Sequence, residues 1–126
     1  EVYRLLRPGG LLVLEYANSW KFKSRITGII TGRHISSLPL ERRRPANIRA
    51  GSIPFVNHHP QSILKALRLC HFEPLRTLSV SNFRSPFLKK IIPLLFLLVL
   101  ESVSQSLLSN FYFGPSIFIL ALKIKN

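Results

Sequence analysis

The sequence has no methionine, no aspartate and a single cysteine among its 126 residues. The lone cysteine, Cys70, excludes an internal disulfide and any zinc site that needs several cysteines. We expect Cys70 to be a small buried residue on a helix, which is a common environment for an unpaired cysteine. The four histidines do not have the spacing of metal ligands, and no aspartate is present to complete a set. The sequence therefore predicts no metal centre.

Acidic residues are also scarce. All five are glutamates, against 18 lysines and arginines, so the formal net charge is +13. A charge of this size suits an anionic partner or a membrane surface. A simpler explanation is also open, in which the acidic residues lie in another part of a longer protein. Of the anionic partners, nucleic acid is the less favoured one.

The chain lacks a hydrophobic run long enough to span a bilayer. Its longest run, Ile91 to Leu100, is interrupted by Pro93 and closed by Glu101. A spanning helix needs about 20 apolar residues. The basic, apolar and small-residue order of a signal peptide is also missing. We expect a cytoplasmic protein that can contact a membrane peripherally, and its hydrophobic content of 47% is ample for a core.

The first seven residues have the pattern of a helix. Val2, Leu5 and Leu6 predict one apolar stripe, and Arg4 and Arg7 lie outside it. The chain therefore opens on the end of a helix.

A turn and a strand follow this helix directly. Pro8 cannot continue the helix, and Gly9–Gly10 permit the positive φ of a tight loop. Leu11 to Leu14 then follow without polar alternation. An uninterrupted apolar run after a helix and a glycine turn predicts a parallel strand that is covered on both faces.

The sequence Leu6-Arg-Pro-Gly-Gly10, followed by an apolar strand and Glu15-Tyr-Ala-Asn18, resembles a known family. It is similar to the region around the fifth strand of class I S-adenosylmethionine-dependent methyltransferases of the type 11 group, where Leu-Lys/Arg-Pro-Gly-Gly usually follows the fourth helix. The remaining elements continue in the order of such a domain. One departure is His71-Phe72, where the family more often has Gly-Phe. The specific motif is confined to residues 1–18.

The next helix begins at Pro60, whose missing N–H costs nothing at the first helical position. Ile63, Leu64, Leu67 and Cys70 supply its apolar stripe. Residues 75–83 predict a strand, with Leu78 and Val80 on one side and Thr77, Ser79 and Ser81 on the other.

Residues 85–113 predict a helical insertion. Ser85–Pro86 has the pattern of a helix start, and Phe96, Leu100, Val103 and Leu107 form a stripe in the second part. Gly114–Pro115 then turns the chain into residues 116–123, which are apolar on both faces as an interior strand must be.

Residues 19–57 show no clear periodicity and predict a lid-like insertion. Within it, residues 20–30 can form a short basic helix. The run of Arg42, Arg43 and Arg44 between two prolines is most simply a solvated loop, with a phosphate-binding patch as the alternative.

Together these elements predict an α/β fold. The resemblance implies the C-terminal part of a Rossmann-like seven-stranded methyltransferase sheet, consisting of strands five and six and an antiparallel strand seven inserted between them. Residues 19–57 and 85–113 are the two insertions, of which the second is helical. Because ligands of open α/β sheets bind at the carboxyl ends of the strands, we expect both insertions at the edge where a methyl donor and its acceptor would meet.

This edge supplies the first candidate site residues. Glu15 is a candidate general base or substrate-orienting group, and the alternative is a charge at the strand end that faces solvent or pairs with an arginine. Tyr16 and Asn18 are candidates for substrate binding, with a turn-forming role as the alternative for Asn18. Arg84 follows the next strand and could bind an anionic group of the substrate, with a surface ion pair as the alternative.

Two histidines directly follow the first insertion. His58 is a second candidate base and His59 a candidate substrate contact. Because Pro60 begins a helix directly after them, helix-cap and loop roles are the alternative for this pair.

The resemblance implies methyl transfer from S-adenosylmethionine to a small-molecule or lipid-like acceptor. The glycine-rich loop and the acidic residue that hold the cofactor in the family have no counterpart here, since Gly9–Gly10 precede a strand instead of following one. Glu1 also begins inside a helical pattern. We therefore expect residues 1–126 to be the C-terminal fragment of one methyltransferase domain, inactive by itself, with the cofactor bound mainly by a preceding half. The alternative is a non-enzymatic basic module that binds an anionic membrane surface or nucleic acid.

Overall fold

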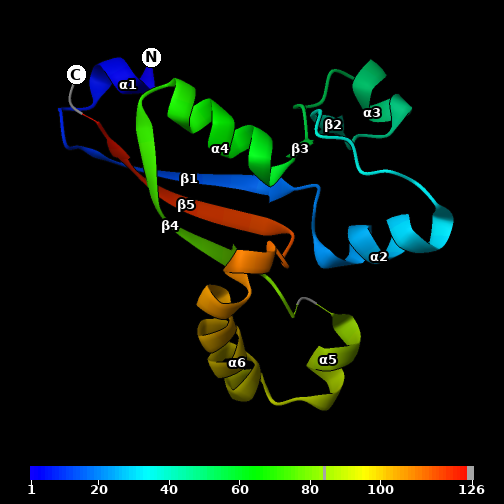
Figure 1. Ribbon diagram of the computed structural model, residues 1–126. Coiled ribbons are helices and arrows are strands. Elements are labelled where there is room, and N and C mark those ends of the chain that lie inside the picture. Colours follow the sequence, from blue (N-terminus) through cyan, green and yellow to red (C-terminus); the bar gives the residue numbers. More distant parts are fainter. Residues whose placement is uncertain (84, 125–126) are drawn as a thin grey trace.

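The structure is a computed structural model that describes residues 1–83 and 85–124. Its helices and strands follow in this order: α1 (Val2–Leu5), β1 (Leu11–Asn18), α2 (Phe22–Thr31), β2 (Leu40–Glu41), α3 (Pro45–Arg49), β3 (Val56–His58), α4 (Pro60–Leu69), β4 (Phe72–Val80), α5 (Pro86–Ile91), α6 (Leu94–Leu107), the 3-10 helix η1 (Ser109–Phe111) and β5 (Ser116–Lys123). The fold is mixed α/β, as the sequence predicts. Its five strands form one mixed sheet in the order β2-β3-β1-β5-β4 (Figure 1).

The last strand of the chain lies inside the sheet, between β1 and β4. β5 is antiparallel to β1 over Leu11 to Ala17 and antiparallel to β4 over nearly the whole of that strand. Ile117 has a partner on each side, Tyr16 in β1 and Ser79 in β4. The predicted position of residues 116–123 between the two earlier strands is confirmed. β4 itself begins at Phe72 and ends at Val80, three residues before the predicted strand at both ends.

The first insertion is more ordered than its sequence indicates. Residues 19–57 form α2, α3 and two short strands, and β3 pairs in parallel with the last two residues of β1. β2 then pairs antiparallel with β3 and becomes the edge of the sheet. The short basic helix predicted in this segment is present as α2. The two strands have only two and three residues, too few to show a periodicity of two.

The core lies between the sheet and α4 (Figure 1). Its buried members come from three strands and one helix: Tyr16, Leu67, Phe72, Ile117, Ile119 and Ala121. Leu67 of α4 is buried, and Ile63 and Leu64 pack partly buried beside it, as the helical stripe predicts. Cys70 is exposed, so its predicted burial is wrong. The reason is that α4 ends at Leu69, and Cys70 begins the turn that leads into β4.

The predicted apolar stripe of the first helix is confirmed for Leu6, the C-cap of α1, but is wrong for Val2 and Leu5. Val2 and Leu5 are exposed, whereas Tyr3 and Leu6 pack against the core cluster. The Lys123 ammonium donates hydrogen bonds to the carbonyl oxygens of Tyr3 and Leu6 at 2.7 and 2.8 Å. It also lies 4.0 Å from the centre of the Tyr3 ring. These contacts anchor α1 to the end of β5.

The opposite face of the sheet is open at its centre. Val13 is 65% exposed, and Leu11 is also exposed. Leu78 and Phe118 line a shallow apolar hollow with Val13 on this face. Among the described residues, α4 and α1 cover only the other face, so the predicted burial of the strand at 11–14 on both faces is wrong for this chain. We call this surface the open sheet face.

The second insertion is helical, as predicted. α5 and α6 form a hairpin below the end of β4 (Figure 1). α6 contacts β4, and the buried residues of α6 are Leu97 and Ser104. The predicted stripe does not form this contact, because Phe96, Val103 and Leu107 are exposed. α6 is apolar on most of its circumference, so periodicity does not identify its buried side. No helix in residues 1–83 and 85–124 combines the length and the hydropathy needed to cross a bilayer.

Candidate functional site

The strand ends that the sequence singles out meet at one edge of the sheet. Since β1 and β4 are both antiparallel to β5, they run in the same direction, and Ala17 and Val80 both have Ser116 as their register partner. Their carboxyl ends therefore lie together beside the start of β5. Both insertions leave the sheet from this edge, as predicted.

Asn18 fastens β1 to the turn that precedes β5. Its Nδ2 donates to the carbonyl oxygens of Tyr112 and Gly114 at 2.7 and 2.9 Å, and its Oδ1 accepts the backbone N–H of Trp20 at 2.8 Å. The residue is fully buried. These are the contacts of the turn-forming role that the sequence left open, and no atom of Asn18 faces solvent. Its role in substrate binding stays a prediction.

A second polar cluster fastens β4 to the same turn. The buried Ser79 hydroxyl accepts the backbone N–H of Gly114 at 2.7 Å and donates to Oδ1 of Asn82 at 2.6 Å. Glu101 of α6 accepts from the backbone N–H groups of Asn82 and Phe83. A Cβ on Gly114 would lie 2.8 Å from the Ser79 hydroxyl oxygen, so only glycine fits here. The edge is thus held by polar groups from three distant segments.

A hollow of about 520 Å³ opens at the end of β1. We call it the strand-end hollow; it is lined by Glu15, Tyr16, Ala17, Lys21, Arg42, Phe55, Asn57, Pro115 and Ser116. Glu15 is exposed at this surface. Glu15 can therefore meet a ligand without a change of structure.

Tyr16 borders the strand-end hollow but places its side chain in the core. It is 6% exposed, and its hydroxyl has no hydrogen-bond partner among the described residues. Burial, with a smaller contribution from Tyr112, raises the pKa of Tyr16 well above its usual value. The phenol therefore stays protonated in the physiological range. It can donate a hydrogen bond, but it cannot act as a base.

The two predicted histidines do not line the strand-end hollow. His58 ends β3, and His59 is the N-cap of α4, where its Nδ1 accepts the backbone N–H of Gln61 at 3.3 Å. The His59 ring also packs edge-on against Trp20, with 5.0 Å between ring centres. These contacts are those of the helix-cap alternative for His59.

We expect the His59 cap to make the stability of the protein sensitive to pH. Burial, and secondarily His34, lowers the pKa of His59. A histidine with a lowered folded pKa binds fewer protons in the folded state, so its contribution is present above the unfolded pKa of about 6.5 and is lost as the pH falls below it. We expect the free energy of unfolding, measured by urea titration, to fall between about pH 7.5 and pH 5.5. His59→Asn keeps a capping acceptor that does not titrate, and should flatten this dependence.

The wild type and His59→Asn both contain the other three histidines. The difference between their pH dependences therefore reports His59 alone. At about pH 7.5, His59→Ala should cost about 1 kcal/mol, the usual effect of losing an N-cap. Equal pH dependence in the wild type and His59→Asn would show that the cap does not titrate.

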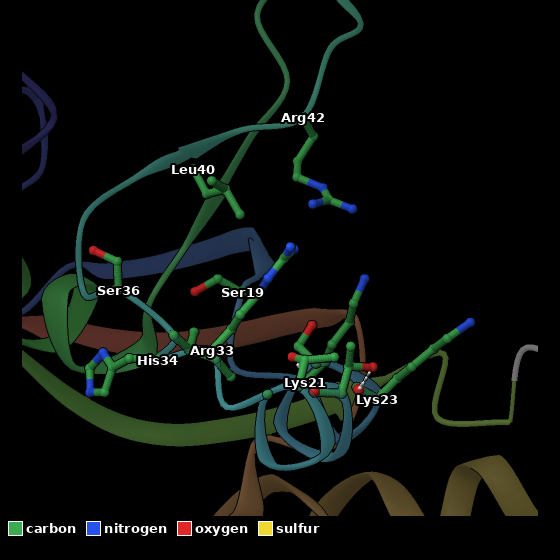
Figure 2. A pocket seen from close by; sticks show the side chains of 13 residues that line it. Ser19, Lys21, Lys23, Arg33, His34, Ser36, Leu40 and Arg42 are labelled. Atoms are coloured by element: carbon green, nitrogen blue, oxygen red, sulfur yellow. Dashed lines mark hydrogen bonds between the residues drawn. The ribbon is translucent and has the colours of Figure 1, made fainter.

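A basic cleft lies beside the strand-end hollow, between α2 and the segment that leads into β2 (Figure 2). Its volume is about 510 Å³. The lining residues that bear or can bear positive charge are Lys21, Lys23, Arg33, His34 and Arg42. No acidic residue lines the cleft. The side chains of Arg33, Arg42 and Lys21 extend toward the same opening (Figure 2).

The three consecutive arginines have different surroundings. Arg42 lines the basic cleft, whereas Arg43 pairs with Glu41 at 2.8 Å. Arg44 is the N-cap of α3. The hydrogen bonds from Arg43 lower the pKa of Glu41 to about 2, so this carboxylate stays ionised and engaged with Arg43. It therefore does not neutralise the cleft.

The structure brings only part of the predicted site together. Glu15 and Tyr16 border one hollow, Asn18 is buried against the turn that precedes β5, and the histidines do not line the hollow. Arg84 lies outside the described residues. The structure also brings Lys21 and Lys23 together with Arg33 and Arg42, a group that we did not predict from the sequence. The available signal was the complete lack of acidic residues between Glu15 and Glu41.

No group of three or more His, Cys, Asp or Glu side chains in the described part of the chain could hold a metal ion. The chain matches no protein-family model and no curated protein.

Proposed function

We propose that this chain is the acceptor-binding part of an S-adenosylmethionine-dependent methyltransferase. The observation that carries the proposal is the position of β5, antiparallel between β1 and β4, directly after the Pro-Gly-Gly entry into β1. The resemblance of residues 1–18 implies this arrangement for strands five, seven and six. Both insertions lie at the carboxyl edge, where α/β sheets bind their ligands.

The open surfaces of the sheet support the proposal that further strands and helices complete this domain. Of the residues of β1, only Ala17 and Asn18 pair with β3, so Leu11 to Tyr16 have no strand on that side among the described residues. An unpaired edge and an apolar open sheet face are stabilised when further strands and helices cover them. In the proposal, these elements belong to a half that precedes β1.

The residues described here do not by themselves fit the cofactor. Gly9 donates its backbone N–H to the carbonyl oxygen of Lys123, which places the glycine turn at the amino end of β1, away from the carboxyl edge. No strand in the described chain is followed by a glycine-rich phosphate-type loop. The cofactor would be held by the preceding half, and this chain would position the acceptor. Glu15, exposed at the strand-end hollow, is the group that can orient the acceptor or receive its proton.

The first test of this proposal needs only the gene. Translation upstream of Glu1 should show a strand followed by a Gly-x-Gly turn within one domain length, about 100–150 residues. An upstream sequence without this strand and turn would remove the methyltransferase assignment.

A second function, peripheral contact with an anionic membrane, is favoured by the α5–α6 hairpin. Nine large apolar residues of this hairpin are exposed: Phe87, Ile91, Leu94, Leu95, Phe96, Leu98, Val99, Val103 and Leu107. Its only acid, Glu101, accepts hydrogen bonds from the backbone at residues 82–83, whereas Lys89 and Lys90 are exposed. Exposed apolar side chains beside cations suit the interface of an anionic bilayer. This contact is compatible with a lipid-like methyl acceptor.

A further inference from the structure

The basic cleft has the composition of a site for a small anion. Lys21, Arg33 and Arg42 come from three segments, and their charged ends extend toward one opening (Figure 2). With no acid in the lining, their charges repel one another unless a ligand balances them. Burial is the main reason that the pKa of Lys21 is lowered, and repulsion by Arg42 and Lys23 lowers it further. A bound anion would relieve this repulsion.

A buried polar group also lacks a partner in this cleft. Ser19 lines the cleft and is only 5% exposed, and its hydroxyl makes no hydrogen bond with any described residue. A buried hydroxyl without a partner is unfavourable unless a ligand or water supplies one. Ser19 can donate this hydrogen bond to an anionic oxygen, and the cations that line the same cleft can bind the same anion.

We propose that the basic cleft binds the phosphate group of the methyl acceptor. This inference rests on the proposed function, and it names the chemistry of the substrate. Lys21 and Arg42 line both the basic cleft and the strand-end hollow, so the two spaces adjoin. A phosphate held in the cleft would extend the rest of its molecule past Lys21 and Arg42 toward Glu15. Arginine and lysine are the usual partners of phosphate, and arginine can bind it with two hydrogen bonds.

Fluorescence of Trp20 can report this binding, because Trp20 is the only tryptophan and adjoins Ser19 and Lys21 in the chain. The probe is inorganic phosphate, titrated against chloride at constant ionic strength. Arg33→Gln and Arg42→Gln should each raise the Kd for phosphate by about tenfold or more, since each removes a charge-assisted hydrogen bond. The matched control is Arg68→Gln, which removes the same charge from the exposed surface of α4 and should leave the Kd within about twofold.

Two arms distinguish the sources of the phosphate. A soluble phosphorylated acceptor predicts that glycerol phosphate competes with inorganic phosphate, and that the cleft variants bind phosphatidylglycerol vesicles as tightly as Arg68→Gln does. A phospholipid acceptor predicts that the cleft variants also bind these vesicles at least about fivefold more weakly than Arg68→Gln. Either result supports the cleft as a phosphate site.

One result overturns the inference: equal phosphate affinity in the cleft variants and Arg68→Gln. Arg33 and Arg42 are exposed, so their substitution should leave the fold intact, and an unchanged urea midpoint checks this. Lys21→Gln provides a third, independent variant of the cleft. Because phosphate binding is measured without S-adenosylmethionine, failure of this test leaves the methyltransferase proposal standing. Failure to bind the cofactor likewise leaves the phosphate site standing.

Discussion

Replacing Asn18 with alanine is expected to lower the free energy of unfolding by about 3 kcal/mol. The substitution removes the only side-chain donor to the carbonyl oxygens of Tyr112 and Gly114 that the structure describes, and it removes the acceptor of the Trp20 N–H. Buried polar groups that lose their partners cost about 1–3 kcal/mol each, and water can recover part of this. The loss should appear as a lower midpoint of urea unfolding at an unchanged m-value.

Two further variants separate hydrogen bonding from side-chain volume. Asn18→Asp has the same shape but places carboxylate oxygen against two carbonyl oxygens, so it should destabilise at least as much as Asn18→Ala. Asn110→Ala, an exposed asparagine in the neighbouring η1, should change the free energy of unfolding by less than about 0.5 kcal/mol. A stable Asn18→Asp protein would contradict the assigned hydrogen bonds.

The double variant Leu95→Ser/Leu98→Ser should bind anionic vesicles about 100-fold more weakly than the wild type. Both leucines are exposed on α6, at 75% and 58%. Burying a leucine side chain is worth about 1.5–3 kcal/mol, and about 3 kcal/mol for the pair corresponds to a factor above 100. The measurement is flotation with vesicles of phosphatidylcholine and about one-fifth phosphatidylglycerol.

The matched control changes two exposed apolar residues of the other insertion, Leu38→Ser/Ile53→Ser. This control should bind the vesicles as the wild type does. If both double variants bind equally, the hairpin is not the membrane contact. If the hairpin leucines instead control a concentration-dependent dimer in analytical ultracentrifugation, the apolar surface is an interface between copies of the chain.

The central strands of the fold could be predicted because their signals are local. β1 and β5 are apolar runs that begin directly after Gly9–Gly10 and Gly114–Pro115, and these turns fix where the strands start. α4 could be predicted for the same reason, since it begins at Pro60 and carries a clear apolar stripe. Such segments carry enough residues for periodicity and turn residues to agree.

Other features depend on contacts that the sequence does not show. α1 has only four residues, so periodicity could not decide between Val2 and Tyr3 as the residue that packs inward. β3 is a strand because it pairs with the end of β1, and its own three residues do not require it. The sequence likewise does not show which side of α6 meets β4, because most of the surface of this helix is apolar.

The candidate site shows the same limit. Glu15 could be identified from its place at the end of a strand, which is a local signal. The partners of Asn18 are 94 and 96 residues away in sequence, so its buried role could be known only from the fold. The basic cleft combines α2 with Arg33 and Arg42, which become neighbours only when the first insertion folds. The scarcity of acidic residues indicated an anionic partner or membrane surface, but it did not indicate where on the protein such a partner would bind.

We propose that this chain belongs to a methyltransferase domain that binds S-adenosylmethionine. The most direct test of this proposal is calorimetric titration of S-adenosylmethionine into the protein extended upstream of Glu1 by one domain length. We predict one site per chain with a Kd between about 1 µM and 1 mM, and weaker or no binding by residues 1–126 alone. The absence of heat from binding in the extended protein, folded by circular dichroism, would contradict it.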